Sequence, residues 1–217
     1  MTRIKICGIR EEVHALAAAE AGADFIGLVF ARSRRQVTPA QAEKITAAVK
    51  KSGYATKVVG VFVNMRTDKV NQIADSCNLD WVQLSGDEPW QYCTELARPI
   101  IKAVRVIRYQ HPDSICNKLA IGERVLATQK HAYLLDSHVK GKYGGTGRTF
   151  DWNSARLAAE QFPVIIAGGL TPDNVTQAIK MVAPWGVDAS SGVETDGVKD
   201  ITKIRAFIEA IRSADGK

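Results

Sequence analysis

The chain has few cysteines, and their spacing argues against the usual cysteine-based structures. Cys7, Cys77, Cys93 and Cys116 are far apart, form no C-x-x-C pair and have no histidine nearby at metal-ligand spacing. We therefore expect neither a disulfide framework nor a structural zinc site. The pattern indicates a reduced, cytoplasmic protein, and no motif predicts a bound metal or cofactor.

Long apolar runs are also missing. No stretch approaches the roughly 18 apolar residues that a membrane-spanning helix needs. The first residues form a strand-like segment, Arg3 to Cys7, without the apolar core of a signal peptide. We therefore expect no association with a membrane.

Positive charge exceeds negative charge, but it is dispersed. The chain has 29 lysines and arginines against 23 acidic residues, and the basic residues cluster only at Arg32, Arg34 and Arg35. No aromatic side chains interleave with this cluster to stack on bases, so a nucleic-acid partner is not expected. A small, multiply charged anion fits the charge balance better.

The sequence does contain a regular alternation of strand and helix patterns. Eight apolar segments are predicted as strands, at residues 3–7, 25–30, 57–63, 81–84, 99–106, 133–136, 164–167 and 186–189. Eight strand–helix units in 217 residues are near the lower size limit of a (β/α)8 TIM barrel. A doubly wound sheet could hold the same alternation but would rarely need eight parallel strands. We therefore predict an α/β fold, a single-domain TIM barrel spanning residues 1–217.

Two predicted helix starts share a threonine–proline pair. Thr38-Pro39 is followed by Gln41, which predicts a capping box with proline in the first turn. Thr171-Pro172 repeats the pair and is predicted to begin a later helix in the same way. Between them, a further helix is predicted from about Asp87 to Ala97.

Two strand ends carry groups that could move protons. Cys7 ends the first strand, and although a cysteine is more often a small core residue, Gly8 behind it leaves one face open. Asp136 ends an apolar strand, where a lone aspartate is more often a helix cap or a salt-bridge partner. Because the carboxyl ends of barrel strands converge on one mouth, Asp136 becomes a plausible acid facing a thiolate base.

Glycine and serine follow the last two predicted strands. Gly168 and Gly169 follow one, and Ser190, Ser191 and Gly192 follow the other. TIM barrels often bind phosphate at this position, although such glycines can also serve only to make tight turns. The glycine-rich segment 144–147 follows a loop and lacks the spacing of a dinucleotide-binding fingerprint. With no redox or hydrolytic motif, these residues favour proton transfer on a phosphorylated substrate.

A set of short motifs, in order along the chain, carries a resemblance to a known family. They are Lys5-Ile6-Cys7-Gly8-Ile9, Ser33-Arg34-Arg35, Gly60-Val61-Phe62-Val63-Asn64, Val82-Gln83-Leu84, Leu134-Leu135-Asp136, Gly144-Gly145-Thr146-Gly147, Phe150-Asp151-Trp152, Ala167-Gly168-Gly169-Leu170 and Asp188-Ala189-Ser190-Ser191-Gly192-Val193-Glu194. In this respect the sequence resembles the phosphoribosylanthranilate isomerases, TIM-barrel enzymes of tryptophan biosynthesis.

The resemblance implies a reaction and roles for three residues. The reaction is the Amadori rearrangement of N-(5-phosphoribosyl)anthranilate to 1-(2-carboxyphenylamino)-1-deoxy-D-ribulose 5-phosphate, without a cofactor. Separately, we expect the chain to act as a monomer or a homodimer. Cys7 would be the base that removes the proton from C2 of the ribose. Asp136 would be the acid that protonates the ring oxygen, and Arg35 would hold the anthranilate carboxylate.

The remaining substrate contacts implied by the resemblance surround the phosphoribosyl group. They are Gly145, Gly168, Gly169, Asp188, Ser190, Ser191 and Gly192. The phosphate would lie on backbone N–H groups near Gly169 and Ser191, with Gly145 closing over it and Asp188 near the ribose hydroxyls. The chain departs from the family at Ser85, where many members have histidine.

Two alternatives remain at this point. A related ribotide isomerase of histidine biosynthesis performs the same chemistry on a substrate with two phosphates, but it typically uses two aspartates, and the first-strand position here is Cys7. A non-catalytic phosphosugar-binding barrel would keep the glycine and serine loops but would need neither Cys7 nor Asp136.

Overall fold

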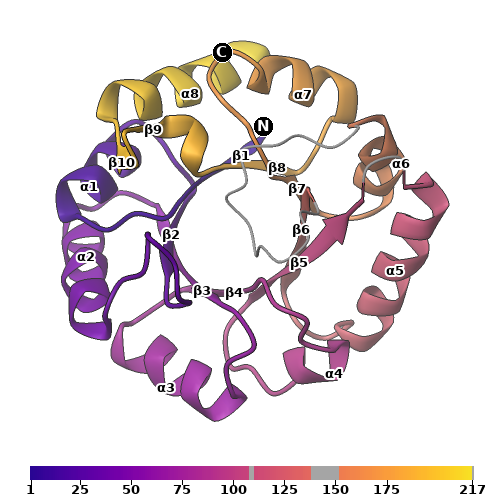
Figure 1. Ribbon diagram of the computed structural model, residues 1–217, viewed down its shortest axis with the longest axis horizontal. Helices are drawn as coiled ribbons and strands as arrows, with labels where there is room; N and C mark the ends of the chain where they lie inside the picture. The colour runs from indigo at the N-terminus through magenta and orange to yellow at the C-terminus, as the bar shows by residue number, and fades with distance from the viewer. Residues whose placement is uncertain (108–109, 138–151, 217) are drawn as a thin grey trace.

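Eight parallel strands close into a barrel in the computed structural model, which describes residues 1–107, 110–137 and 152–216 (Figure 1). The strands are β1 (Arg3–Cys7), β2 (Phe25–Val29), β3 (Lys57–Phe62), β4 (Trp81–Leu84), β5 (Ile100–Val106), β6 (His131–Ser137), β7 (Val164–Ile166) and β8 (Gly186–Ala189). Each strand pairs with its sequence neighbour, and β8 returns to pair with β1. The predicted TIM barrel is confirmed.

Helices surround the barrel in the order of the chain (Figure 1). They are α1 (Glu12–Glu20), α2 (Pro39–Lys51), α3 (Thr67–Ser76), α4 (Trp90–Cys93), α5 (Pro112–Val125), α6 (Asn153–Gln161), α7 (Val175–Val182) and α8 (Ile201–Ala214). After β8 come a short 3-10 turn, η1 (Ser191–Val193), and a hairpin of β9 (Glu194–Thr195) and β10 (Val198–Lys199). Within the described ranges, no helix is long and apolar enough to span a membrane.

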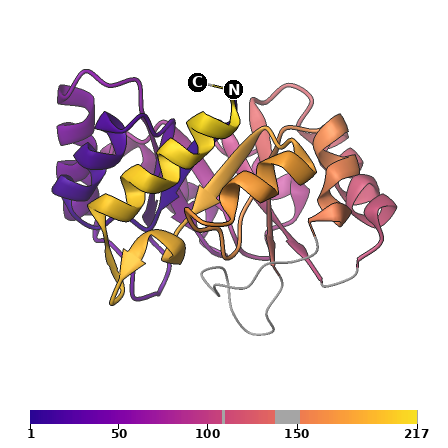
Figure 2. The same cartoon turned by 90° about the horizontal axis from the view of Figure 1, so that it is seen from above.

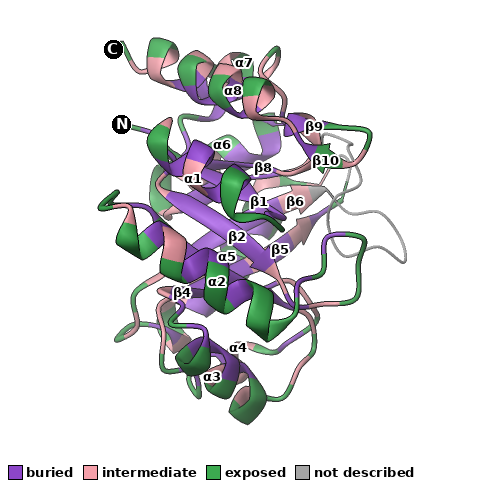
Figure 3. Cartoon of the chain, turned by 90° about the vertical axis from the view of Figure 1, so that its left-hand side faces the viewer, coloured by how far each residue is buried: buried purple, intermediate pink, exposed green. Residues whose placement is uncertain are grey.

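The alternation of side chains along each strand divides the core into two layers. Outward-facing residues such as Ile4 and Ile6 belong to the large cluster between strands and helices, whereas Phe25, Trp81 and Ile101 belong to a smaller cluster inside the barrel. Figure 3 shows buried strands at the centre and exposed residues on the outer faces of the helices. Strands covered on both faces explain the near-continuous apolar runs in the sequence.

The two threonine–proline pairs have different structures. Thr38 caps α2 as predicted: its side chain accepts from Gln41 N at 3.2 Å, and the Gln41 side chain accepts from Thr38 N at 2.9 Å. The second prediction is wrong, because α7 begins at Val175. There the Asn174 side chain accepts from Thr171 N at 2.8 Å and donates to the Gly169 carbonyl at 2.9 Å, so that the segment is held in a turn.

The prediction of a helix from Asp87 to Ala97 is also wrong, since α4 is a single turn, Trp90–Cys93. Glu88 folds back before it and accepts hydrogen bonds from Asn64 N at 2.7 Å and Gly86 N at 3.2 Å. Pro89 therefore lies at the start of the turn, where a missing N–H costs little. At the other end, Ala97 N donates to the Asn71 side chain at 3.1 Å instead of to a helical carbonyl.

The carboxyl ends of the strands all open on one side of the barrel. Figure 2 shows the β9–β10 hairpin on this side and both termini on the opposite side. This arrangement places the residues that follow each strand around a common mouth, as the barrel rule requires.

Candidate active site

A cavity of about 610 Å³ occupies the mouth of the barrel. It is lined by residues from the ends of several strands, and five of the residues singled out from the sequence are among them: Cys7, Arg35, Asp136, Asp188 and Ser190. The structure therefore brings the predicted thiol, carboxyl and guanidinium groups to one cavity.

The position of Cys7 follows from the alternation along β1. Ile4 and Ile6 point outward into the helical layer, so Lys5 and Cys7 point into the barrel. Gly8 has a φ of +81°, and a Cβ there would lie 2.4 Å from Arg35 Cδ. The glycine is needed because a side chain would both strain the backbone and displace Arg35.

A buried ion pair lies beside Cys7. Lys5 Nζ is 2.8 Å from Asp188 Oδ1, and the two side chains are 1% and 9% exposed. The pair joins β1 to β8, where Lys5 and Asp188 are in register. Sequence reasoning missed the importance of Lys5. Its spacing of two residues from Cys7, which puts both side chains on one face of the strand, was the available signal.

Opposing charges act on Cys7. Burial raises the pKa of the thiol above its usual value, and the Asp188 carboxylate raises it further, while the ammonium groups of Lys5 and Lys199 lower it. Burial lowers the pKa of Lys5, but Asp188 and Cys7 outweigh it, so that this pKa lies above its usual value. Lys5 is therefore a buried ammonium group that favours the thiolate form of Cys7, although burial keeps the pKa of that thiol raised.

Glu194 organises the basic side of the mouth. Arg35 donates from Nε to Glu194 Oε1 at 2.6 Å and from Nη2 to Oε2 at 2.9 Å. Lys199 and the largely exposed Arg34 contact the same carboxylate, each at 2.7 Å. Burial raises the pKa of Glu194, but hydrogen bonds from Arg35 and Lys199 bring it below its usual value. Glu194 belongs to the motif that follows the last strand and carries the family resemblance, but the sequence alone did not identify it as a site residue.

The β9–β10 hairpin connects this basic cluster to the loop after β8. Lys199 Nζ donates to the Ser190 carbonyl at 2.7 Å as well as to Glu194. Asp196 and Gly197 both have positive φ values, of 49° and 81°, as expected for an Asp-Gly hairpin turn. The hairpin thus fixes Arg35 and Ser190 relative to one another.

The predicted phosphate-binding residues also come together. A second, smaller hollow adjoins the main cavity and is lined by Gly168, Gly169, Ser190, Ser191 and Gly192. Gly168 and Gly169 have φ values of +89° and +66°, and a Cβ on Gly192 would lie 1.8 Å from the Leu170 carbonyl oxygen. At these points only glycine fits the backbone path. Gly145 and its neighbours 144–147 lie outside the described residues.

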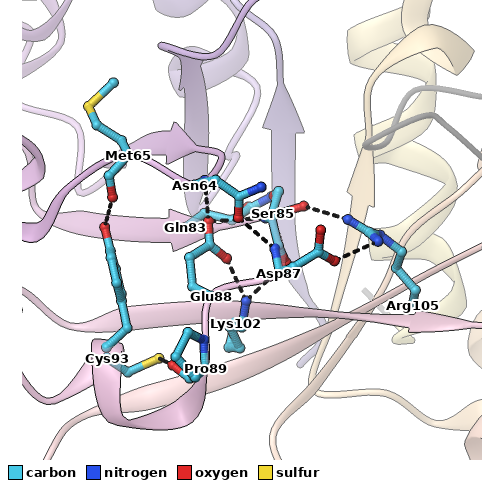
Figure 4. A network of polar contacts seen from close by, with 12 residues as sticks. Asn64, Met65, Gln83, Ser85, Asp87, Glu88, Pro89, Cys93, Lys102 and Arg105 are labelled. Atoms are coloured by element: carbon cyan, nitrogen blue, oxygen red, sulfur yellow. Dashed lines mark hydrogen bonds and ion pairs between the residues drawn. The ribbon is translucent and has the colours of Figure 1, made fainter.

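Polar groups at the ends of β4 and β5 complete the mouth. Gln83 donates to Ser85 Oγ at 3.0 Å, and its buried Oε1 has no hydrogen-bond partner within the described part of the chain. Arg105, which sequence reasoning missed, lines the cavity and pairs with Asp87 at 2.9 Å (Figure 4). The mouth therefore offers several donors that suit an anionic ligand.

The arrangement of side chains in the cavity suits acid–base chemistry. Among the described residues, no group of three or more His, Cys, Asp or Glu side chains could hold a metal ion. A thiol and a carboxyl group instead line one cavity, with a basic cluster and a glycine-lined hollow at its edges. Such a site can exchange protons with a bound molecule that carries negative charge at two points.

Comparisons with known proteins agree with this geometry. A family model described as N-(5'-phosphoribosyl)anthranilate (PRA) isomerase matches residues 4–210. The N-(5'-phosphoribosyl)anthranilate isomerase of Dehalococcoides mccartyi is 44% identical over 216 residues, which cover 100% of this chain and 98% of the relative.

Solved structures give the same result. A structure of monomers generated from the dimeric phosphoribosylanthranilate isomerase of Thermotoga maritima matches with a TM-score of 0.81 and 33% identity, covering 98% of this chain and 100% of that one. A phosphoribosyl anthranilate isomerase in complex with reduced 1-(o-carboxyphenylamino)-1-deoxyribulose 5-phosphate matches with a TM-score of 0.81 and 34% identity over the same shares. The chain belongs to the N-(5'-phosphoribosyl)anthranilate isomerase family.

Proposed function

We propose that this protein catalyses the Amadori rearrangement of N-(5-phosphoribosyl)anthranilate in tryptophan biosynthesis, with Cys7 as base and Asp136 as acid. The observation that carries the proposal is that Cys7 and Asp136 line one cavity, between a basic cluster at Arg35 and a glycine-lined hollow. The substrate has the matching shape, with a carboxylate at one end, a phosphate at the other and the reacting ribose carbons between them.

Two proton transfers account for the chemistry. The Asp136 carboxyl group gives a proton to the ring oxygen, which opens the furanose and leaves an iminium ion between C1 and the anthranilate nitrogen. The Cys7 thiolate then takes the proton from C2, and the electron pair of that C–H bond forms the enamine, which tautomerises to the ketone. Asp136 ends as a carboxylate and Cys7 as a thiol, so one proton enters the substrate and one leaves it.

Arg35 can hold the anthranilate carboxylate although it already contacts Glu194. The contact with Glu194 uses Nε and Nη2 of the guanidinium group, which leaves the edge formed by Nη1 and Nη2 for a second carboxylate. Glu194 thereby fixes the orientation of Arg35 before the substrate binds. A contact formed in advance lowers the entropy cost of binding.

The glycine-lined hollow is the proposed phosphate site. Gly169 and Ser191 belong to turns whose backbone comes close together because Gly192 has no side chain. Backbone N–H groups in such turns bind dianions well. Asp188 lines both this hollow and the main cavity, which supports its proposed contact with the ribose between the two ends of the substrate. Gly145 remains the proposed cover of the phosphate.

The proposed base also bears on the cellular compartment of the reaction. Cys7, Cys77, Cys93 and Cys116 are all free thiols in the structure, and a thiolate base needs a reducing environment. We therefore place the reaction in the cytoplasm. The Thermotoga maritima relative is dimeric, and the proposal for this chain is a monomer or a homodimer that binds a small anionic molecule.

The direct test is to add freshly prepared N-(5-phosphoribosyl)anthranilate and follow the loss of its fluorescence while the product is identified by mass and chromatography. We expect rapid loss with the ketose product. The ribotide substrate of histidine biosynthesis is the matched comparison, and we expect no turnover of it. Well-folded protein that leaves the anthranilate substrate unchanged would contradict the proposal and favour a binding role for the barrel.

A further inference from the structure

The proposed base has to be ionised, yet its surroundings oppose ionisation. Only the thiolate form of a cysteine is a good proton acceptor at neutral pH. Cys7 is 7% exposed, and burial by itself raises the pKa of the thiol. Some neighbouring group must offset this effect if the residue is to accept a proton from the substrate.

Lys5 is the group placed to do so. Lys5 and Cys7 share the inner face of β1, and Gly27 of β2 lies in register with Cys7. The point that a Cβ of Gly27 would occupy is 2.8 Å from Cys7 Sγ and 3.2 Å from Lys5 Nζ. The ammonium group and the sulfur are therefore neighbours, and they share space that any residue other than glycine at position 27 would fill.

Lys5 has hydrogen-bond donors beyond the one that contacts its ion-pair partner. Its side chain is 1% exposed, and its carboxylate partner Asp188 accepts one of its three hydrogens at 2.8 Å. An ammonium group has further donors to offer. A buried charge of this kind is costly, and an apolar residue would pack the barrel interior more cheaply.

We propose that Lys5 is a positioning residue for proton transfer: its ammonium group stabilises the thiolate form of Cys7, and the Asp188 carboxylate, which pairs with that ammonium group, moderates the effect. The use of that thiolate as the base rests on the proposed function. The electrostatic relation between Lys5 and Cys7 does not, and it can be measured without any substrate.

Charges from four elements act together on Cys7. Lys5 on β1 and Lys199 on β10 favour the thiolate, and Asp188 on β8 disfavours it. Arg35, in the loop after β2, also interacts electrostatically with Cys7. The two members of the ion pair therefore act on Cys7 in opposite directions, which gives the proposal a signature that a purely structural ion pair would not produce.

The test is the pH dependence of alkylation of Cys7 by iodoacetamide, read by peptide mass for the wild type, Lys5→Gln and Asp188→Asn, with Cys7→Ser as the blank. In Lys5→Gln we expect the midpoint to rise by about one to three pH units, and the rate at pH 7 to fall roughly tenfold or more. In Asp188→Asn we expect the midpoint to fall.

Cys93 is an internal control in the same samples. Its pKa is raised to about 11, chiefly by burial, with Lys102 lowering it and Glu88 raising it. It is fully buried, so it should stay unlabelled at neutral pH in every variant. Labelling of Cys93 would reveal unfolding, and circular dichroism would identify the same variants.

Three outcomes decide the proposal. Midpoints that move in opposite directions in folded Lys5→Gln and Asp188→Asn support it. Midpoints that stay at the wild-type value, or move together, overturn it. If Lys5→Gln does not fold, Lys5→Met, which keeps the length of the side chain without its charge, decides in its place: a raised midpoint supports the proposal, and an unchanged or lowered midpoint overturns it. A turnover assay separates the two proposals. If the alkylation midpoints shift as expected but the wild type does not act on the anthranilate substrate, only the proposed function fails.

Discussion

The barrel contains two buried groups of the same kind, each made of a lysine, an acidic residue and a cysteine. The inner group is Lys5, Asp188 and Cys7, inside the barrel at its mouth. The outer group is Lys102, Glu88 and Cys93. Lys102 faces the helical layer, because its strand neighbours Ile100 and Val104 lie in the outer core cluster. Each group has a lysine–carboxylate pair, with N–O distances of 2.8 and 2.7 Å.

The two groups differ in what surrounds the ion pair. In the outer group, shown in Figure 4, Glu88 also accepts from the backbone N–H groups of Asn64 and Gly86. Lys102 also donates to the Gly86 carbonyl at 3.3 Å. Backbone groups of the neighbouring loops therefore complete the outer group. In the inner group, Cys7 and Asp188 line the cavity at the mouth, so that the cysteine can meet a ligand. Lys102 and Glu88 of the outer group also line a hollow, of about 300 Å³, but Cys93 is not among its lining residues. The two groups contain the same kinds of residue, and they differ in whether the cysteine can reach a ligand.

The largest effect is expected at Asp136, which lines the same cavity as Cys7 of the inner group. Asp136→Asn should lower kcat about 10²- to 10⁴-fold, because the amide cannot supply the proton for ring opening. Substrate affinity should stay close to that of the wild type, as expected for a group that acts in the transition state. Steady-state kinetics and a titration with the reduced product analogue would measure both. Normal turnover would remove Asp136 from the mechanism.

The outer group should affect stability and not turnover. Lys102→Gln leaves the Glu88 carboxylate buried without its cation, so we expect the free energy of unfolding to fall by about 3–5 kcal/mol. Urea denaturation measures this change. At a temperature where the variant is folded, kcat and KM should equal those of the wild type. A large loss of kcat in folded Lys102→Gln would show that the two groups are not distinct in function.

A smaller effect is expected at the binding end of the mouth. Arg35→Ala should raise KM roughly 10- to 100-fold, in line with the loss of a hydrogen bond to a charged group, with a smaller change in kcat. Arg35→Lys is the matched control. It keeps the charge but loses the planar fork, so its KM should lie between the other two. An unchanged KM in Arg35→Ala would exclude contact with the substrate carboxylate.

Strand ends were predictable, whereas contacts between loops were not. Cys7, Asp136 and Ser190 were found because strand ends in a barrel meet at one mouth. Thr171-Pro172 was misread as a helix start because the deciding contact, from Asn174 to Gly169, depends on a loop path that local sequence does not reveal. The capping box at Thr38 was read correctly since both of its partners lie within four residues.

The charged partners of the site were the hardest to predict. Glu194 contacts Arg35 across about 160 residues of chain, and Asp188 contacts Lys5 across the barrel closure between β8 and β1. Such pairs depend on tertiary register, which a single sequence does not give. Lys5 itself could have been noticed, because a lysine two residues from a strand-end cysteine points to the same face.

The most direct test of the account compares the two cysteines. The loss of N-(5-phosphoribosyl)anthranilate fluorescence should be followed with the wild type, Cys7→Ala and Cys93→Ala under the same conditions. Cys7→Ala should be slower by about 10²- to 10⁴-fold, and Cys93→Ala should match the wild type. Turnover of Cys7→Ala at the rate of the wild type would contradict the assignment of the base and, with it, the distinction between the inner and outer groups.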